Sequence, residues 1–484
     1  MRSLVRLAVI ALPVAMLIPL CGFTYDSKQT LDADMIVTAA PVYLPLAALR
    51  GDERFPKGAQ LLLVHAGVAE PLVTGFAATA DANVSFDGKS VLFAGKQTAS
   101  DPWQIWELTL NDRAVRKVIP TATDAERPLY LPGGRLVWAQ RTPWGFQLNS
   151  AADGRPPAES PLNPTAGPGV LPLTYFETSA FPADVLADGR ILFEAGFPLG
   201  SGSTPELYLV YADGSGVESY RCDHGRARWG GKQLASGDVV FTHGAALARF
   251  TSALAHEAPV VAPQAKYAGA IAETASGDWL LSVKTGAATH FAIKLWKPGS
   301  ASMQTLLTRG GEDLVEPVVV APRTRPNRHP SGLHPWTYAN LLALDSRLSR
   351  AGDLKTTPAS VRLETLDAQG RVAINGTAPV DSDGSFFVQV PGDKPIRFIL
   401  LDRKGAVLRR EQGWFWSRSG EQRICVGCHT GPERASENRM PAVLMRTTTP
   451  FDLTGAKAMN TAQEKTQSSP GTALRPRIDS PGGN

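Results

Sequence analysis

The sequence predicts an all-β protein: a β-propeller followed by a small antiparallel β-module that carries a C-x-x-C-H segment. Three observations support this fold class. The 484-residue chain contains 45 glycines and 38 prolines, which favours short strands joined by turns over long helices. A glycine turn followed by an apolar run recurs between residues 85 and 284. After the repeat, apolar and polar residues alternate between further turns, as expected for half-buried strands.

The N-terminal residues 1–22 have the pattern of a targeting segment. Two arginines precede an apolar run from Leu7 to Leu20. This run is too short to cross a bilayer comfortably and fits the apolar region of a signal peptide or an N-terminal anchor. Cys21 raises a lipid anchor as an alternative, although Leu20 stands where lipoprotein signals usually have a small residue. We therefore expect an extracytoplasmic, periplasmic protein that touches the membrane only through this segment.

Residues 31–322 are predicted to form the propeller. Five similar units share a glycine turn, a polar residue and a short apolar run: "SFDGKSVLFAG" (85–95), "LPGGRLVWAQ" (131–140), "LADGRILFEAG" (186–196), "LASGDVVFTHG" (234–244) and "TASGDWLLSVK" (274–284). Glycine supplies the positive φ of a tight turn, and the apolar run predicts a buried strand. A period in the forties with several strands per unit is typical of propeller blades, whereas a β-sandwich stack does not require it.

A sixth unit is expected to be composite. Residues 58–67 and 313–323 each supply strand-like segments but lie at opposite ends of the repeat. Together they would close the ring as one blade. The sequence therefore predicts six blades, with seven as the alternative.

The β-module is predicted to occupy residues 323–450, after a proline-rich joint. Its strongest strands are "SFFVQV" and "IRFILLD", which lie between glycine-containing turns. From Thr461 onward the chain is polar and rich in Pro, Gly and Ser, so residues 461–484 are predicted to be a disordered tail.

The motif "CVGCH" combines Cys425, Cys428 and His429. C-x-x-C-H is the attachment signature of c-type haem: each thiol forms a thioether with one vinyl group, and the adjacent imidazole ligates the iron. Structural zinc would need a fourth ligand, and a redox disulfide would be expected in a βαβ setting. The motif therefore favours one covalent haem c over either alternative, with His429 as an axial iron ligand.

A sixth iron ligand is less clearly marked in the sequence. His334 lies in the joint between the two parts, and Met440 and Met445 follow the motif shortly. A methionine ligand would raise the reduction potential, while the alternative is that "MPAVLM" only packs beneath the haem. Trp414 and Trp416 are expected to pack at the haem edge, since a buried porphyrin needs apolar walls.

The stretch "PVDSDGSFFVQVPGDKPIRFILLD" followed by "GEQRICVGCHTGPE" resembles the middle domain of the hydrazine synthase alpha-subunit family. The similarity runs from about residue 323 to 444, and "SFDGKSVLFAG" with "QIWELTLNDRAVRKV" is similar to the TolB-like propeller repeat. The resemblance implies one c-type haem, held by Cys425, Cys428 and His429 in a domain docked against the propeller. In that family a tyrosine four residues after the motif histidine can ligate the haem, but here the position is Glu433.

These observations predict an exported monohaem c-type redox protein. It would exchange electrons with a partner protein or use the haem on a small molecule, and the sequence leaves open whether it is an enzyme. The alternative is a propeller scaffold that binds a partner and carries a merely structural haem. Net charge is only +4 and basic residues form no dense stripe, so no nucleic-acid partner is expected.

Overall fold

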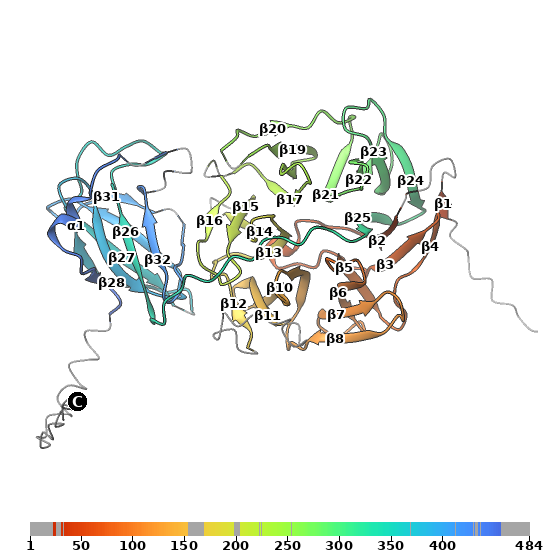
Figure 1. The fold of residues 1–484 in the computed structure, drawn as a ribbon, viewed down its shortest axis with the longest axis horizontal. Coiled ribbons are helices and arrows are strands. Elements are labelled where there is room, and N and C mark those ends of the chain that lie inside the picture. Colours follow the sequence, from red (N-terminus) through yellow and green to blue (C-terminus); the bar gives the residue numbers. More distant parts are fainter. Residues whose placement is uncertain are drawn as a thin grey trace, which may run out of the picture.

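The computed structural model describes residues 23–25, 31, 33–152, 169–197, 204–221, 223, 225–252, 254–367, 369–411, 413–428, 430, 434–435 and 437–455. The predicted targeting segment (1–22, including Cys21) and the predicted tail (461–484) lie outside these residues. His429 and Glu433 also lie outside them. Figure 1 shows two adjoining parts, a larger one from the first two thirds of the chain and a smaller one from the last third.

Five sheets of the larger part follow one another along the chain, and within each sheet neighbouring strands pair antiparallel. The first two contain β5 (Ala78–Val84), β6 (Ser90–Lys96), β7 (Gln104–Thr109) and β8 (Val115–Ile119), then β9 (Ala125–Leu131), β10 (Arg135–Thr142), β11 (Gly145–Ala152) and β12 (Leu171–Pro172). The next two contain β13 (Ala180–Val185), β14 (Ile191–Phe197), β15 (Thr204–Val210) and β16 (Glu218–Ser219), then β17 (Arg228–Gln233), β18 (Val239–His243), β19 (Ala246–Phe250) and β20 (Ala258–Pro259). The fifth contains β21 (Lys266–Glu273), β22 (Trp279–Lys284), β23 (Ala292–Trp296) and β24 (Gln304–Arg309), with β1 (Phe23–Tyr25) added at its edge.

A sixth sheet joins the two ends of this region. In it β25 (Asp313–Val320) pairs with β2 (Asp34–Ala40), which continues into β3 (Gln60–His65) and β4 (Val68–Pro71). The short helix η1 (Ala48–Arg50) lies between β2 and β3. The composite unit predicted from residues 58–67 and 313–323 is thereby confirmed.

The six sheets form a closed ring. Each first strand contacts the first strand of the next sheet, in the order β5, β9, β13, β17, β21, β25 and back to β5. Apolar side chains fill the spaces between neighbouring sheets; Val91 and Phe93 of β6, for example, share a buried cluster with Ile36 and Leu61 of the composite sheet. A single four-stranded sheet cannot bury both faces, so each sheet depends on its neighbours.

Charged side chains meet at the first strands of three sheets. Arg54, from the β2–β3 connection, donates to Asp81 of β5 at 2.7 Å, to Glu126 of β9 at 3.1 Å and to Glu316 of β25 at 3.2 Å. A buried arginine is tolerated only when its charge and its N–H groups are matched in this way. No periodic pattern in the sequence predicts this network of charged side chains.

The segment after β25 crosses the turns that identify the repeat. Arg323 N donates to Phe86 O at 3.0 Å and Asn327 N donates to Ala187 O at 2.9 Å. A Cβ added at Gly189 would lie 2.2 Å from Asn327 O. Residues 321–337 therefore lie as a strap on successive sheets, and the strap is visible in Figure 1 as the strand-free trace that leads to the smaller part.

The smaller part is a two-sheet module. One sheet has the order β28 (Val372–Pro379), β27 (Ser360–Leu366), β30 (Ile396–Leu401) and β31 (Val407–Arg410). The other has the order β32 (Gln422–Cys425), β26 (Tyr338–Ala343), β29 (Phe386–Pro391) and β33 (Phe451–Asp452), with the short helix α1 (Ala442–Arg446) beside it. The strands expected from "SFFVQV" and "IRFILLD" are β29 and β30, and their inward side chains share one core.

Two pairings in the module differ from the antiparallel arrangement expected. β32 runs parallel to β26, and β33 runs parallel to β29. Neither strand follows its partner through a hairpin; each arrives after a long connection, which allows a parallel direction. The parallel placement of β32 fixes where the cysteine motif begins.

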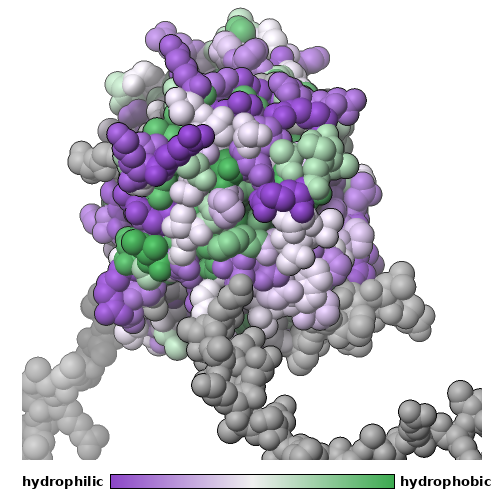
Figure 2. Space-filling view, turned by 90° about the vertical axis from the view of Figure 1, so that its left-hand side faces the viewer, coloured by the Kyte–Doolittle hydropathy of each residue, from purple (hydrophilic) through white to green (hydrophobic). Residues whose placement is uncertain are grey.

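Figure 2 looks onto the end of the molecule formed by the module, where hydrophilic side chains surround smaller apolar patches. The large exposed apolar side chains of the module are Val372, Ile374, Val407, Ile424, Met440, Met445 and Phe451. In the described part of the chain, no helix has the length and apolar character needed to cross a bilayer.

Two glycines of the repeat provide a matched test of the strap. Gly189 and Gly237 occupy equivalent turns with φ of 88° and 91°, but only Gly189 lies beneath the strap; at Gly237 an added Cβ meets nothing within 4 Å. Gly237→Ala should cost about 1–2 kcal/mol of stability, from backbone strain alone. Gly189→Ala should add a clash with Asn327 to this strain. Each further 1.4 kcal/mol by which the clash weakens the binding of the strap should raise the fraction of molecules with a detached strap about tenfold.

Limited trypsin digestion measures how often the strap detaches, because cleavage after Arg323 and Arg328 needs a detached strap. Unfolding in urea measures the global stability of each variant. Equal cleavage rates in the two variants would show that the strap does not depend on contact with this turn.

Candidate functional site

The cysteine motif begins at the end of an ordered strand. β32 lies beside β26 with Cys425 opposite Ala343, and Leu344 N donates to Cys425 O at 2.9 Å. Gly427 follows in a tight position, where an added Cβ would lie 2.8 Å from Leu348. The glycine between the two cysteines thus lets the chain turn closely against Leu348. Cys425 and Cys428 both pack against the module core as a result.

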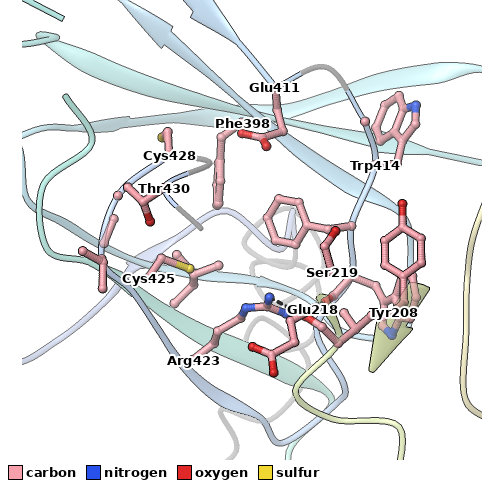
Figure 3. A pocket seen from close by; sticks show the side chains of 18 of the residues that line it. Tyr208, Glu218, Ser219, Phe398, Glu411, Trp414, Arg423, Cys425, Cys428 and Thr430 are labelled. Carbon is pink, nitrogen blue, oxygen red and sulfur yellow. Dashed lines mark hydrogen bonds between the residues drawn. The ribbon is translucent and has the colours of Figure 1, made fainter. Parts of the chain in front are cut away.

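Both thiols open into a cavity of about 390 Å³ between the module and the propeller-like ring. In Figure 3 the two sulfur atoms lie at one side of this space, and Tyr208 and Trp414 lie at the other. A volume of this size falls within the range of small-molecule and cofactor sites. The cavity is thus bounded by both parts of the molecule, and the cysteines belong to its module wall.

The cavity walls are rich in aromatic and aliphatic side chains. The ring contributes Phe176, Tyr208, Leu209, Val217 and Tyr220, and the module contributes Leu341, Ala343, Phe386, Phe398, Trp414, Phe415, Trp416 and Ile424. The aromatic ring of the Phe176 side chain lies edge-on to that of Trp416, with centroids 4.8 Å apart, and to that of Tyr208, with centroids 5.0 Å apart. Trp414 and Trp416 were expected at a haem edge, and both line this cavity.

A short module segment anchors the two parts to each other. Trp416 inserts into the apolar cluster formed by β10, β11, β13, β14 and β15. Arg418 donates to Asp213 O at 3.1 Å, to Tyr175 Oη at 2.8 Å and to Asp393 at 2.6 Å. Glu421 accepts from Gly216 N at 3.1 Å. These contacts fix the wall positions, so the cavity is part of the folded structure.

The thiols of Cys425 and Cys428 are free and half-buried. Neither Cys425 nor Cys428 takes part in a disulfide. Burial raises the pKa of both thiols above the ordinary cysteine value, and the nearby Arg423 guanidinium opposes the rise at Cys425 only in part. Thiols of this kind are poor nucleophiles, because the thiolate is the reactive form.

Charged side chains occupy a minority of the lining. They are Glu177, Arg190, Glu218, Glu411 and Arg423. Glu218 pairs with Arg190 at 2.7 Å. Arg423 donates to the carbonyl oxygens of Val217 at 2.7 Å and Trp416 at 3.2 Å. Both acceptors are neutral, so these hydrogen bonds do not neutralise the positive charge of the guanidinium. Burial raises the pKa of Glu177, and the attraction of Arg397 counteracts this in part.

The other residues considered from the sequence are not brought to this cavity. His334 is exposed, stacks on Trp336 with centroids 4.3 Å apart, and is not among the lining residues. Met440 is 63% exposed and also lies outside the lining. It directly precedes a segment held by Asp383, which accepts from Ala442 N at 2.8 Å. His429 follows Cys428 in the sequence but lies outside the described residues.

The described residues fit a haem in several respects. Two free thiols three positions apart face a cavity with flat aromatic walls. Ile424, beside Cys425, also lines it and is 68% exposed, so a bound apolar group would cover a side chain that is otherwise open to water. Arg423 offers a positive charge for an anionic substituent. Among the described residues, His, Cys, Asp and Glu form no group of three or more that could hold a metal ion directly.

Sequence reasoning missed the residues that build the propeller side of the site. Phe176, Glu177 and Tyr208 lie outside the motif and carry no signature, and Arg418 and Glu421 are ordinary residues of a charged loop. Only their convergence in space distinguishes them.

Comparison with known proteins supports the resemblance drawn from the sequence. Residues 350–430 match the family model described as the hydrazine synthase alpha subunit middle domain, and this stretch is less than half of the chain. Comparison with curated proteins gives no significant match.

Among solved structures, Kuenenia stuttgartiensis hydrazine synthase is similar with a TM-score of 0.72 and 16% identity, covering 85% of this chain and 71% of that one. TolB from Acinetobacter baumannii has a TM-score of 0.43 and 12% identity, covering 60% and 67%. A TolB-type protein from Agrobacterium tumefaciens has a TM-score of 0.39 and 12% identity, covering 59% and 98%. At these identities the likeness concerns the fold. The chain therefore shares its fold with hydrazine synthase, and its residues 350–430 carry the middle domain of the hydrazine synthase alpha-subunit family.

Proposed function

We propose that this protein is an exported monohaem c-type cytochrome-like redox protein that works in the periplasm. The observation that carries the proposal is the cavity between the two parts, into which both thiols of the C-x-x-C-H motif open. Free thiols at this spacing match the attachment signature of haem c, and the aromatic walls and the positive charge of Arg423 suit a flat apolar macrocycle with carboxylate substituents.

In this proposal Cys425 and Cys428 carry the two thioethers, and His429 is the axial ligand by motif. The haem, when bound, supplies a redox-active iron. Arg423 would offset the negative charge of a propionate, since both its hydrogen bonds go to carbonyl oxygens. Phe176, Tyr208 and Phe398 would exclude water from the macrocycle, and a dry site strengthens electrostatic control of a redox centre.

The six sheets of the ring are, in this proposal, the six blades of a propeller that supplies one wall of the haem site. We propose electron exchange with a redox partner protein, or haem chemistry on a small molecule. Hydrazine formation is not assigned to this chain, because the family match covers only residues 350–430 and the structural likeness is at 16% identity.

Alkylation of the haem-free protein tests the protonation of the two thiols. Raised pKa values reduce the thiolate fraction, so modification of Cys425 and Cys428 by iodoacetamide at pH 8 should be at least about tenfold slower in the folded than in the urea-unfolded protein. Mass spectrometry of the tryptic peptide 424–434 measures the modification. Equal alkylation rates in the folded and unfolded protein would contradict shielded, neutral thiols.

The raised thiol pKa values also make the stability of the haem-free protein depend on pH. Since the folded state favours the protonated thiols, the free energy of unfolding should fall as pH rises from about 8.5 towards the raised pKa values of the folded state.

Haem staining after denaturing electrophoresis tests attachment itself. In a host competent for cytochrome c maturation, the wild-type band should stain and the double variant Cys425→Ser/Cys428→Ser should not, because both covalent links are gone. Cys222, in "SYRCDHG", lies outside the motif, so Cys222→Ser is the control and should stain as the wild type does. An unstained wild-type band, or a stained double variant, would remove the basis of the proposal.

A further inference from the structure

The strap (residues 321–337) carries positive charge and no negative charge. Its sequence, "APRTRPNRHPSGLHPWT", contains three arginines and two histidines but neither aspartate nor glutamate. Two of the arginines, Arg325 and Arg328, are exposed, and in the described part of the chain neither forms an ion pair. The strap therefore presents unneutralised guanidinium groups to solvent.

The backbone of the strap is held in place, which leaves these two side chains available to a partner. Arg323 N donates to Phe86 O at 3.0 Å on the ring, and His334 N donates to Gly420 O at 2.9 Å on the module. The Arg323 guanidinium also lies over the Phe86 ring, 4.4 Å from the centroid, and so anchors its own end of the strap. Four prolines restrict the backbone further. Because the segment is already ordered, it loses little conformational entropy when a partner binds to it.

The strap passes close to the cavity onto which both thiols open. It runs from β25 across the ring to the smaller part (Figure 1). On the ring, Asn327 covers the turn at Gly189, and Arg190, the residue after this glycine, lines the cavity. On the module, the strap binds Gly420, two residues before β32, the strand that ends in Cys425. A partner with an ordinary footprint of about 800 Å² that covered the strap would therefore lie against the edge of the cavity.

Three aspartates lie in turns along the strap, and each is engaged elsewhere. Asp188 pairs with Arg190 at 2.8 Å. Asp213 accepts from Ser331 Oγ at 2.6 Å, and Asp87 accepts from a serine hydroxyl of its own turn at 2.6 Å. These carboxylates lower the overall positive charge of this face, but none of them pairs with an exposed arginine of the strap. Both guanidinium groups thus keep their hydrogen-bond donors for a carboxylate from outside the chain.

We propose that the strap is the docking surface for an acidic redox partner, whose carboxylates pair with Arg325 and Arg328 and which thereby lies beside the haem cavity. Arginine suits this role, because its planar guanidinium forms two parallel hydrogen bonds with one carboxylate. Opposite charge on the two surfaces also speeds their encounter and orients it. The inference rests on the proposed haem attachment and adds to it the chemistry of the partner and the surface that the partner meets.

Two small inorganic oxidants of opposite charge test whether the strap acts on the haem. In the reduced, haem-loaded protein at low ionic strength, Arg325→Glu/Arg328→Glu should slow oxidation by ferricyanide about three- to tenfold. The same variant should speed oxidation by the cationic tris(phenanthroline)cobalt(III) by a similar factor. Both effects should fall within about twofold in about 1 M salt, where charges are screened over a few ångströms. Unchanged rates with both oxidants would overturn the place of the strap beside the haem.

The matched control makes the same change in net charge at another site. Arg403 and Lys404 lie in the turn between β30 and β31, and both are exposed. Arg403→Glu/Lys404→Glu should leave both oxidation rates within about twofold of the wild type. If this control changed the rates as much as the strap variant does, overall charge would explain the effect and the strap would have no special role.

Binding of fluorescent poly-L-glutamate to the full chain tests the docking surface without electron transfer. At low salt, Arg325→Glu/Arg328→Glu should weaken this binding at least about tenfold, and Arg403→Glu/Lys404→Glu should leave it within about twofold. Vesicles of phosphatidylglycerol are the comparison for an anionic membrane. A wild type that binds these vesicles through the strap but does not bind poly-L-glutamate would overturn an acidic protein as the partner.

Haem staining separates the failure of this inference from that of the proposed function. An unstained wild type overturns haem attachment, and with it the redox role of any partner. A stained wild type whose poly-L-glutamate binding survives Arg325→Glu/Arg328→Glu overturns the docking surface alone.

Discussion

The docking of residues 413–421 onto the propeller-like ring is the interaction on which the site depends. Trp416 enters an apolar cluster that otherwise belongs to the ring, and Arg418 next to it is almost fully buried. A buried guanidinium is stable only when its N–H groups are satisfied, and Arg418 finds a carbonyl, a hydroxyl and a carboxylate. Gly214 makes this fit possible: a Cβ there would lie 2.8 Å from Arg418 Cδ.

The same docking explains why the cavity has two different walls. The module contributes the cysteines and most of the aromatic lining, all on strands or on short loops tied to them. The ring contributes Phe176, from the connection between β12 and β13, and Tyr208 of β15, and both pack against Phe193 of β14. Each wall is backed by an apolar core, and the space between the two walls is a gap of cofactor size.

The strap after β25 connects these two halves in a second way. It lies on the turns that contain Gly88 and Gly189, where any larger residue would strike the Pro322 or Asn327 backbone. The glycines that form hairpins in the repeat thus also leave room for the chain that leads to the module. One local requirement, a residue without a Cβ, serves both the repeat and the orientation of the two parts.

The sequence by itself determined the elements that repeat or that have fixed spacing. Short apolar runs after glycine turns predicted the second strand of five sheets, and the two half-units at the ends of the repeat predicted the composite sheet. The C-x-x-C-H spacing identified Cys425 and Cys428. These features are local, so they are readable without the fold.

Tertiary structure alone decided what faces those cysteines. Glu177 and Tyr208 are separated from the motif by long stretches of chain and share no pattern with it. The parallel pairing of β32 was also not foreseen, since strand direction depends on a long connection. His334, from the joint, and Met440, shortly after the motif, both lie outside the cavity lining; His334 stacks on Trp336, and Met440 directly precedes Pro441 at the start of α1. Proximity in sequence does not fix which side of a strand or turn a side chain takes, because packing with distant residues decides it.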